Sequence, residues 1–303
     1  MLLVKMKKLL LFCCFILLSQ STLWSQRTKG GDGLAAVVKT LPSFEINDNF
    51  IDAKNRYILK KDAARIAVRL LNTAQRDMDQ TVEIPESVLK PIYNSLVAVS
   101  ASKIEQADTT INILKIRTFT STNVNMVMLV FDLDADWIKP LKAHADTTGS
   151  PVINKIMKRY KLSVNKIASL DDEHNGLVLQ AKDPININAL MRLFYQEAGV
   201  ACIDPIPLFG DGNDIEMKVE NKTFTVVFSL RYGKCTEKCD RRRDWTFKVS
   251  EGGQVNFVGV KGAGIPDYIL KPAVEKSVKL KIDNKNNPNN KSDVQEAAKK
   301  ENG

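Results

Sequence analysis

The stretch Val124-Asn-Met-Val-Met-Leu-Val-Phe-Asp-Leu133 decides how the middle of the chain is built. Its apolar residues fall on both alternating faces, whereas a strand with one wet face alternates between apolar and polar residues. The pattern therefore predicts a strand in the middle of a sheet, with structure covering each of its faces.

Local signals on the C-terminal side of this strand predict a compact unit over residues 121–208. Capping residues, polar turns and apolar periodicity place its further elements. These elements are a helix from Ser150-Pro151, strands over 162–170 and 176–181, a helix from near Asn186 to Gly199, and a strand over 200–203. The order strand, helix, strand, strand, helix, strand is the ferredoxin-like split βαβ arrangement, which we expect here.

The end of this unit resembles part of a known family. The run Ile187-Asn-Ala-Leu-Met-Arg-Leu-Phe-Tyr-Gln-Glu-Ala-Gly-Val-Ala-Cys-Ile-Asp-Pro205 is similar to the last helix and strand of subtilisin-type propeptides. Those also end in a helix, a Val-rich strand and an acidic residue before Pro or Asn. The resemblance implies an inhibitor or chaperone of a separate protease, with Asp204-Pro-Ile-Pro-Leu208 in the protease cleft.

Residues 1–26 have the composition of a secretory signal peptide. Three lysines precede an apolar core from Leu9 to Leu18, which is too short to span a membrane. The Ser-Gln ending resembles secreted proteins of Bacteroidota. We expect export to the periplasm, the cell surface or the medium, and no integral membrane segment after cleavage. An uncleaved anchor is the alternative.

The charge balance excludes one class of partner. Without the three lysines of residues 1–26, 41 basic residues face 35 acidic ones, a net charge of +6. The tail, residues 271–303, carries eight Lys and five acidic residues, so half of this excess lies there. A body this close to neutral argues against a dedicated nucleic-acid binder. The tail lacks apolar residues to bury and is predicted to be disordered.

The N-terminal region, residues 27–120, is predicted to be largely helical. After a polar start leading to an extended arm, a helix is expected with Asp62 as its cap, and another from Pro85-Glu86. Residues 111–119 are expected to form a strand. Because the central strand is apolar on both faces, we expect the helical pair to cover its second face. Dimerisation through that face is the alternative.

The C-terminal region, residues 209–270, reads as an antiparallel β module. Strands are expected over 224–231, 245–249 and 255–259, with a loop over 232–244. The combination Tyr232-Gly-Lys-Cys235, Cys239 and Trp245-Thr-Phe-Lys-Val249 resembles a C-terminal motif of uncharacterised secreted Bacteroidota proteins, a family that implies no activity. Thr236, Glu237 and Lys238 depart from the small residues and Pro found there.

The cysteines predict one disulfide. Cys235 and Cys239 are four residues apart, a separation that a turn brings within bonding range, and export permits oxidation. Closing so small a loop stabilises the fold by ~2 kcal/mol. A zinc site would need four ligands, and a redox pair would favour Cys-x-x-Cys spacing. Cys202 is predicted to be a buried thiol, with an interchain bridge as the alternative.

Metal-binding patterns are weak. Asp132, Asp134 and Asp136 imitate an EF-hand, but the glycine and the final glutamate of that loop are missing. The side-chain oxygens of Asp211, Asn213 and Asp214 suit calcium, although such residues are ordinary turn formers. We predict no metal and no cofactor.

No catalytic motif is present either. His144 and His174, the only histidines, stand in polar loops without a nucleophile elbow or a metalloprotease signature. We assign no catalytic residue, and a hydrolase would require a constellation of distant residues.

A basic cluster around the cysteine pair is the candidate binding surface. It consists of Lys234, Lys238, Arg241, Arg242 and Arg243, and an anionic glycan, a lipid head group or an acidic protein would suit it. A solvated loop with ion pairs to Asp240 and Asp244 is the alternative. The sequence therefore predicts an exported, non-enzymatic binding protein, with the protease inhibitor and the hydrolase as alternatives.

Overall fold

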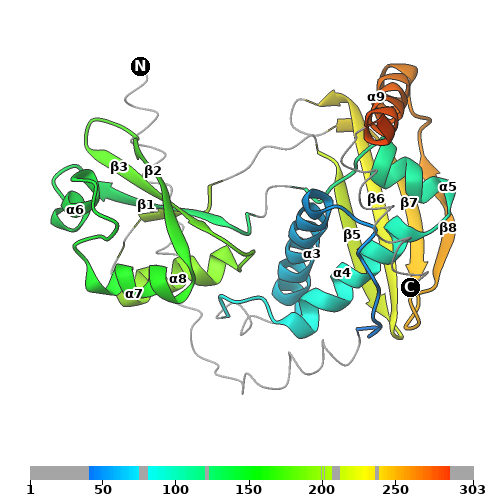
Figure 1. Cartoon of the computed structure of the whole chain (residues 1–303). Helices are drawn as coiled ribbons and strands as arrows, with labels where there is room; N and C mark the ends of the chain where they lie inside the picture. Colours follow the sequence, from blue (N-terminus) through cyan, green and yellow to red (C-terminus); the bar gives the residue numbers. More distant parts are fainter. Residues whose placement is uncertain are drawn as a thin grey trace, which may run out of the picture. The chain divides into compact units, whose positions relative to one another are not determined.

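The computed structural model describes residues 41–74, 81–119, 123–198, 200, 202–206, 212–235 and 239–286. The predicted signal peptide, the residues up to 40, Asp211, Lys238 and the last part of the tail lie outside these ranges. The described residues form helices and two four-stranded antiparallel sheets, which confirms the α+β class (Figure 1). None of the described helices is long and apolar enough to cross a membrane.

The first sheet is built by residues 123–206, which we call the βαββαβ unit. Its strands are β1 (Met126–Asp132), β2 (Leu162–Ser169), β3 (His174–Ala181) and β4 (Cys202–Asp204). They lie in the order β2-β3-β1-β4, and all neighbours are antiparallel. The predicted interior position of the central strand is therefore confirmed.

Two helices cover one face of this sheet, α7 (Pro151–Arg159) and α8 (Ile187–Ala198) (Figure 1). The Ser150 hydroxyl accepts a hydrogen bond from the Ile153 N–H at 3.3 Å, so the predicted cap is present. The short helices η3 (Asp136–Ile138) and α6 (Lys139–Lys142) connect β1 to α7. The core of the unit combines Val127, Leu129, Phe131, Ile153, Ile156, Leu177, Leu179, Leu190 and Phe194.

The second sheet is a meander of β5 (Asp214–Glu220), β6 (Thr223–Cys235), β7 (Cys239–Val249) and β8 (Val255–Gly262). Alternate residues of β6 are buried, from Phe224 to Tyr232. This apolar stripe packs against α3 (Ala53–Ala74) and α4 (Glu86–Ala101), so that residues 41–119 and 212–269 share one core (Figure 1). Their separation in sequence arises because the βαββαβ unit is inserted between them.

The expected packing of the helical pair is therefore wrong. The helices cover the C-terminal sheet, whose buried stripe requires an apolar layer. On the second face of β1, Met126, Met128 and Val130 are only half-buried, and they belong to neither core of the described residues.

The predicted strand over residues 111–119 is also wrong. This segment contains the π-helix η2 (Thr109–Ile113), which follows α5 (Glu105–Asp108), and continues without regular secondary structure to residue 119. Side chains of the helical layer and of β5 bind its backbone. The Thr118 N–H donates to the carboxylate of Asp62 at 3.1 Å, and the Phe119 N–H donates to that of Asp214 at 2.7 Å. These bonds replace a β ladder.

Three further expectations need correction. Asp62 is not a cap, because α3 begins at Ala53 and Asp62 lies inside the helix, 1% exposed. The predicted loop over 232–244 is wrong for residues 232–235 and 239–244, because these belong to β6 and β7, which pair with each other. Part of the predicted disordered tail is helical, since α9 (Asp267–Asn286) includes residues 271–286.

Candidate functional site

Strands β6 and β7 extend beyond their neighbours as a two-stranded arm. β5 pairs with β6 only as far as Ser229, and β8 pairs with β7 only from Arg243 onward. The arm, residues 231–235 and 239–242, is closed at its end by the disulfide between Cys235 and Cys239, whose Cα atoms are 4.0 Å apart. The predicted disulfide is confirmed.

The three arginines of β7 do not form one surface, because successive side chains of a strand point to opposite faces. Arg242 lies on the outer face, where it bonds the Asp244 carboxylate, the Ser229 hydroxyl at 3.0 Å and Glu216 at 3.4 Å. The pKa of Arg242 is raised, and the largest contribution comes from its hydrogen bond to Asp244. The positive charge of Arg242 is thus balanced by carboxylates of the same sheet.

Arg243 has a structural role on the opposite face. Its guanidinium carbon lies 5.6 Å from the centre of the Trp245 ring, and its Nη1 donates to the Ala263 carbonyl at 3.1 Å. The arginines of the predicted basic cluster therefore do not all share one face, and Lys238 lies outside the described residues. The reason is that the arginines stand on a strand, where alternation separates them.

Two described cations of the patch stay available to a partner. The side chains of Lys234 and Arg241 are exposed and make no hydrogen bond or ion pair within the described ranges. Their backbone is fixed, because the Lys234 N–H donates to the Asp240 carboxylate at 3.0 Å. Gly233 has φ +93, and an added Cβ would overlap the same carboxylate. The arm therefore holds both cations on a defined backbone.

The side-chain oxygens of Asn213 and Asp214, which the sequence offered as calcium ligands, bind groups of the protein itself. The Asn213 side-chain oxygen accepts from the Arg231 N–H at 2.8 Å. The Asp214 carboxylate binds the Arg69 guanidinium at 2.9 Å. The cation that pairs with Asp214 is therefore an arginine, and Asp211 lies outside the described residues. Cys202, predicted to be buried, is a half-buried thiol in β4.

A buried charge cluster joins α3 to the segment after η2. Asp62 Oδ1 accepts two hydrogen bonds from Thr118, while its Oδ2 has no hydrogen-bond partner and lies 4.0 Å from Arg117 Nε. Desolvation by burial raises the pKa of Asp62, against the opposing effects of Thr118, Arg117 and Arg65. Burial likewise lowers the pKa of Arg117. This cluster concentrates ionisable groups in a dry environment, as binding sites often do.

A cavity of about 210 Å³ lies beside Arg117. Its walls come from the loop before α3, the first turns of α3, the end of α4 and the π-helix. The lining residues are Phe50, Ile51, Asp52, Asn55, Leu59, Ser100, Ile111, Asn112 and Arg117. The sequence analysis missed this site. Its only local signal was an acidic residue, Asp62, next to the apolar stripe of α3.

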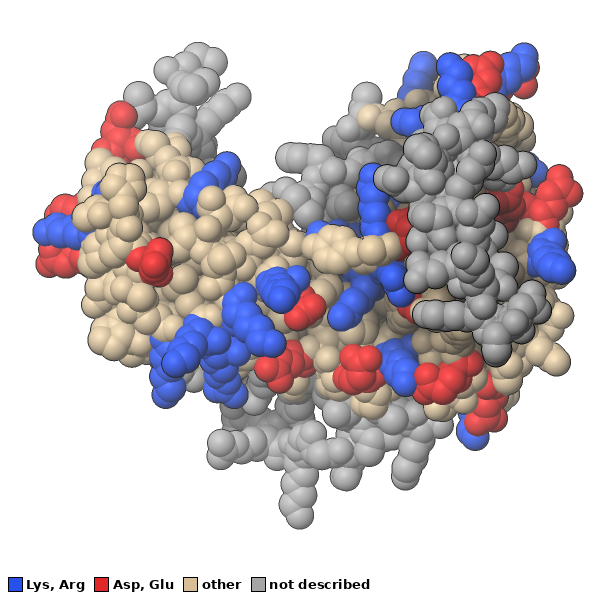
Figure 2. All heavy atoms as spheres, in the orientation of Figure 1, with Lys and Arg blue, Asp and Glu red and all other residues tan. Residues whose placement is uncertain are grey.

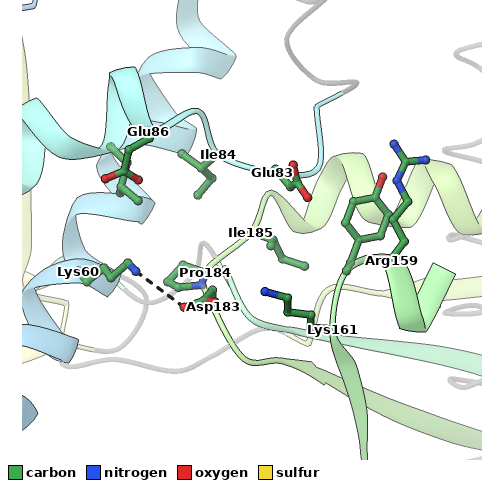
Figure 3. A pocket seen from close by; sticks show the side chains of 11 residues that line it. Lys60, Glu83, Ile84, Glu86, Arg159, Lys161, Asp183, Pro184 and Ile185 are labelled. Atoms are coloured by element: carbon green, nitrogen blue, oxygen red, sulfur yellow. Dashed lines mark ion pairs between the residues drawn. The ribbon is translucent and has the colours of Figure 1, made fainter.

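A second cavity, of about 270 Å³, has mixed charge (Figure 3). Lys60, Arg159 and Lys161 line it together with Glu83, Glu86 and Asp183, and Lys60 forms an ion pair with Asp183 at 3.7 Å. Because the opposite charges are equal in number, the lining selects no particular ligand charge.

The βαββαβ unit carries opposite charges at the two ends of β2. Lys155, Lys158 and Arg159 stand on α7, and Lys161 precedes β2. Figure 2 shows Lys and Arg gathered over this end. The turn at the other end of β2 holds Asp171, Asp172 and Glu173.

His174 lies at this acidic end. Its Nδ1 is 2.9 Å from Asp171 Oδ1, and its Nε2 is 3.7 Å from Asp132 Oδ1. The pKa of Asp171 is lowered. The largest contribution is the hydrogen bond from the Glu173 backbone N–H, and His174 lowers this pKa further. No hydrogen bond in the described part of the chain joins the His174 ring to a Ser, Thr or Cys side chain. His144 stands in an exposed turn at φ +66.

Comparisons of this chain with protein-family models, with curated proteins and with solved structures find no match. Among the described residues, no group of three or more His, Cys, Asp or Glu side chains is placed to hold a metal ion. The function is therefore inferred from the geometry of the described residues.

Proposed function

We propose that the protein is an exported, non-enzymatic binding protein that recognises an anionic partner through the disulfide-closed arm. The observation that carries this proposal is the pair of exposed cations, Lys234 and Arg241, on a covalently closed two-stranded element. The disulfide also supports export, because such bonds persist in oxidising compartments.

A closed arm suits recognition because its backbone is already ordered before the partner arrives. Ordering a loop on binding costs free energy, which a disulfide and paired strands largely remove in advance. Tyr232 fixes the base of the arm, since its hydroxyl shares its single proton between the carbonyl oxygens of Ala263 at 2.9 Å and Gly264 at 2.7 Å. Within the described ranges neither cation forms an ion pair, so both side chains can attract acidic groups of a partner.

The architecture supports a scaffold for binding. The strand order β2-β3-β1-β4, with α7 and α8 on one face, supports placing the βαββαβ unit in the ferredoxin-like class. Folds of this class carry many unrelated functions, so the arm rather than the fold argues for the activity.

A capture experiment from the producing organism's envelope tests the proposal. The wild type is compared with Lys234→Ser/Arg241→Ser and with a control, Lys218→Ser/Lys248→Ser, which removes two exposed charges from the outer face of the same sheet. We expect a partner that is retained by the wild type and the control, is lost from the arm variant, and weakens with added salt. Equal capture by all three proteins would show that Lys234 and Arg241 of the arm do not bind the partner.

A protease inhibitor related to subtilisin propeptides is the second candidate. The face opposite α7 and α8 supports it, because Met126, Met128 and Val130 are half-exposed there and Asp204 lies beside Met128 in the register. Such an apolar face suits a protein surface. Purified protein should then slow a subtilisin-type protease, and Met128→Lys should weaken the inhibition. The absence of inhibition across a panel of such proteases would exclude this candidate.

A further inference from the structure

We infer that the cavity beside Arg117 binds a small carboxylate with a short aliphatic chain, the carboxylate at the Arg117 guanidinium and the chain against Leu59 and Ile111. No residue of the arm lines this cavity, so a negative binding result here would not contradict the proposed function.

Arg117 has unused donor capacity. A guanidinium offers five N–H donors, and among the described residues that of Arg117 makes one hydrogen bond, from Nη1 to the Ile116 carbonyl at 3.1 Å. Its nearest anion, Asp62 Oδ2, is 4.0 Å from Nε, too far for a hydrogen bond. A planar guanidinium binds carboxylates in a fork with two hydrogen bonds. The partly buried position of Arg117 strengthens such a contact, because water screens it less.

The remaining wall suits an aliphatic chain. Ile51, Leu59 and Ile111 are 7%, 4% and 4% exposed, and their side chains line the cavity together with Phe50, which is 58% exposed. An apolar wall with one oriented charged group is the usual composition of a small-molecule site. The volume of about 210 Å³ lies below the usual range of such sites and therefore selects a small ligand.

Asp52 is the only carboxylate in the lining, and it is already engaged. Its Oδ1 accepts from the Asn55 N–H at 2.9 Å, and its Oδ2 accepts from the Asn55 side-chain amide at 2.6 Å. It therefore caps the first turn of α3. Arg117 is thus the one charged group of the lining that has donors to offer a ligand.

The π-helix η2 shapes the cavity. Its wide turn places Ile111 and Asn112 in the wall, and Lys115 in the left-handed region at φ +52 ends the turn before Arg117. π-helical turns are rare and occur frequently at functional sites. A non-glycine residue at positive φ is likewise retained only where the surrounding structure holds it. This second observation is independent of the charge argument.

The test uses isovalerate as the probe and isovaleramide as its uncharged counterpart of the same shape. Binding to the full chain is measured by calorimetry and by saturation-transfer NMR. We expect isovalerate to bind with a dissociation constant of roughly 0.1–1 mM, as suits a ligand of this size, and isovaleramide at least about ten times more weakly.

Three variants locate the site. Arg117→Gln should abolish isovalerate binding, and Ser100→Leu should abolish it by filling the cavity without changing any charge. Arg56→Gln, which removes an exposed arginine of α3 outside the lining, should bind like the wild type. If Arg117→Gln fails to fold, Ser100→Leu still decides the question. No binding by the wild type, equal binding of the amide, or unchanged binding by Ser100→Leu would overturn the inference.

Discussion

Replacing Asp214 by alanine should destabilise the core that the N-terminal helices share with the C-terminal sheet. The Asp214 carboxylate accepts hydrogen bonds from Arg69 Nη1 at 2.9 Å and from the Phe119 N–H at 2.7 Å. These groups are 145 and 95 residues away in sequence, so this carboxylate joins α3, β5 and the segment after η2.

The expected loss is about 3 kcal/mol. A hydrogen bond to a charged group contributes ~1.5–3 kcal/mol, and two long-range bonds are lost. The side chains of Asp214 and Arg69 are 15% and 30% exposed, so we take the lower end of that range for each bond. Glu216→Ala is the control. The Glu216 side chain is 44% exposed and lies 3.4 Å from Arg242, so this ion pair should contribute less than ~1 kcal/mol to the free energy of unfolding.

Urea unfolding measures this loss. Trp245, which is 3% exposed in the shared core, reports the unfolding transition by its fluorescence. The measurement uses a Trp137→Phe background, so that the βαββαβ unit contributes no tryptophan fluorescence. With a slope of about 2 kcal/mol/M, the midpoint should fall by about 1.5 M. A double-mutant cycle with Arg69→Ala should give a coupling of ~1–2 kcal/mol. A loss below ~1 kcal/mol, or additive effects, would refute the reasoning.

Three further predictions concern charge, covalent closure and backbone conformation. Burial raises the pKa of Asp62 above 3.8, so its contribution to stability is present at low pH and is lost as the pH rises through the raised value. Wild type should therefore lose stability relative to Asp62→Asn between pH 4 and 7, and a difference in urea midpoint that is equal at both pH values would contradict this. Replacing Cys235 and Cys239 by serine should cost ~2 kcal/mol, and an unchanged melting temperature would count against it. Gly262→Ala should destabilise by more than ~1 kcal/mol, since φ is +98 and the new Cβ would lie 2.1 Å from a β7 carbonyl oxygen. Gly264→Ala, which meets nothing within 4 Å, should be nearly neutral in the same thermal melt.

The main helices and strands of the βαββαβ unit and the disulfide could be predicted from local sequence patterns alone. Ser150 and Pro151 specify the start of α7, and the apolar run of 124–133 specifies an interior strand, because caps and periodicity act within a few residues. The cysteine pair is equally local, since four residues separate its members.

Which element covers each apolar face, and which charged side chains pair, follows from the three-dimensional packing of the chain and could not be predicted from the sequence. Periodicity shows that a face of α3 or β6 is apolar, but it carries no information on which partner covers it. The cavity beside Arg117 depends on a π-turn and on residues such as Leu59 and Arg117, which lie far apart in the sequence. Contacts of this range depend on how the chain closes on itself, which no local pattern records.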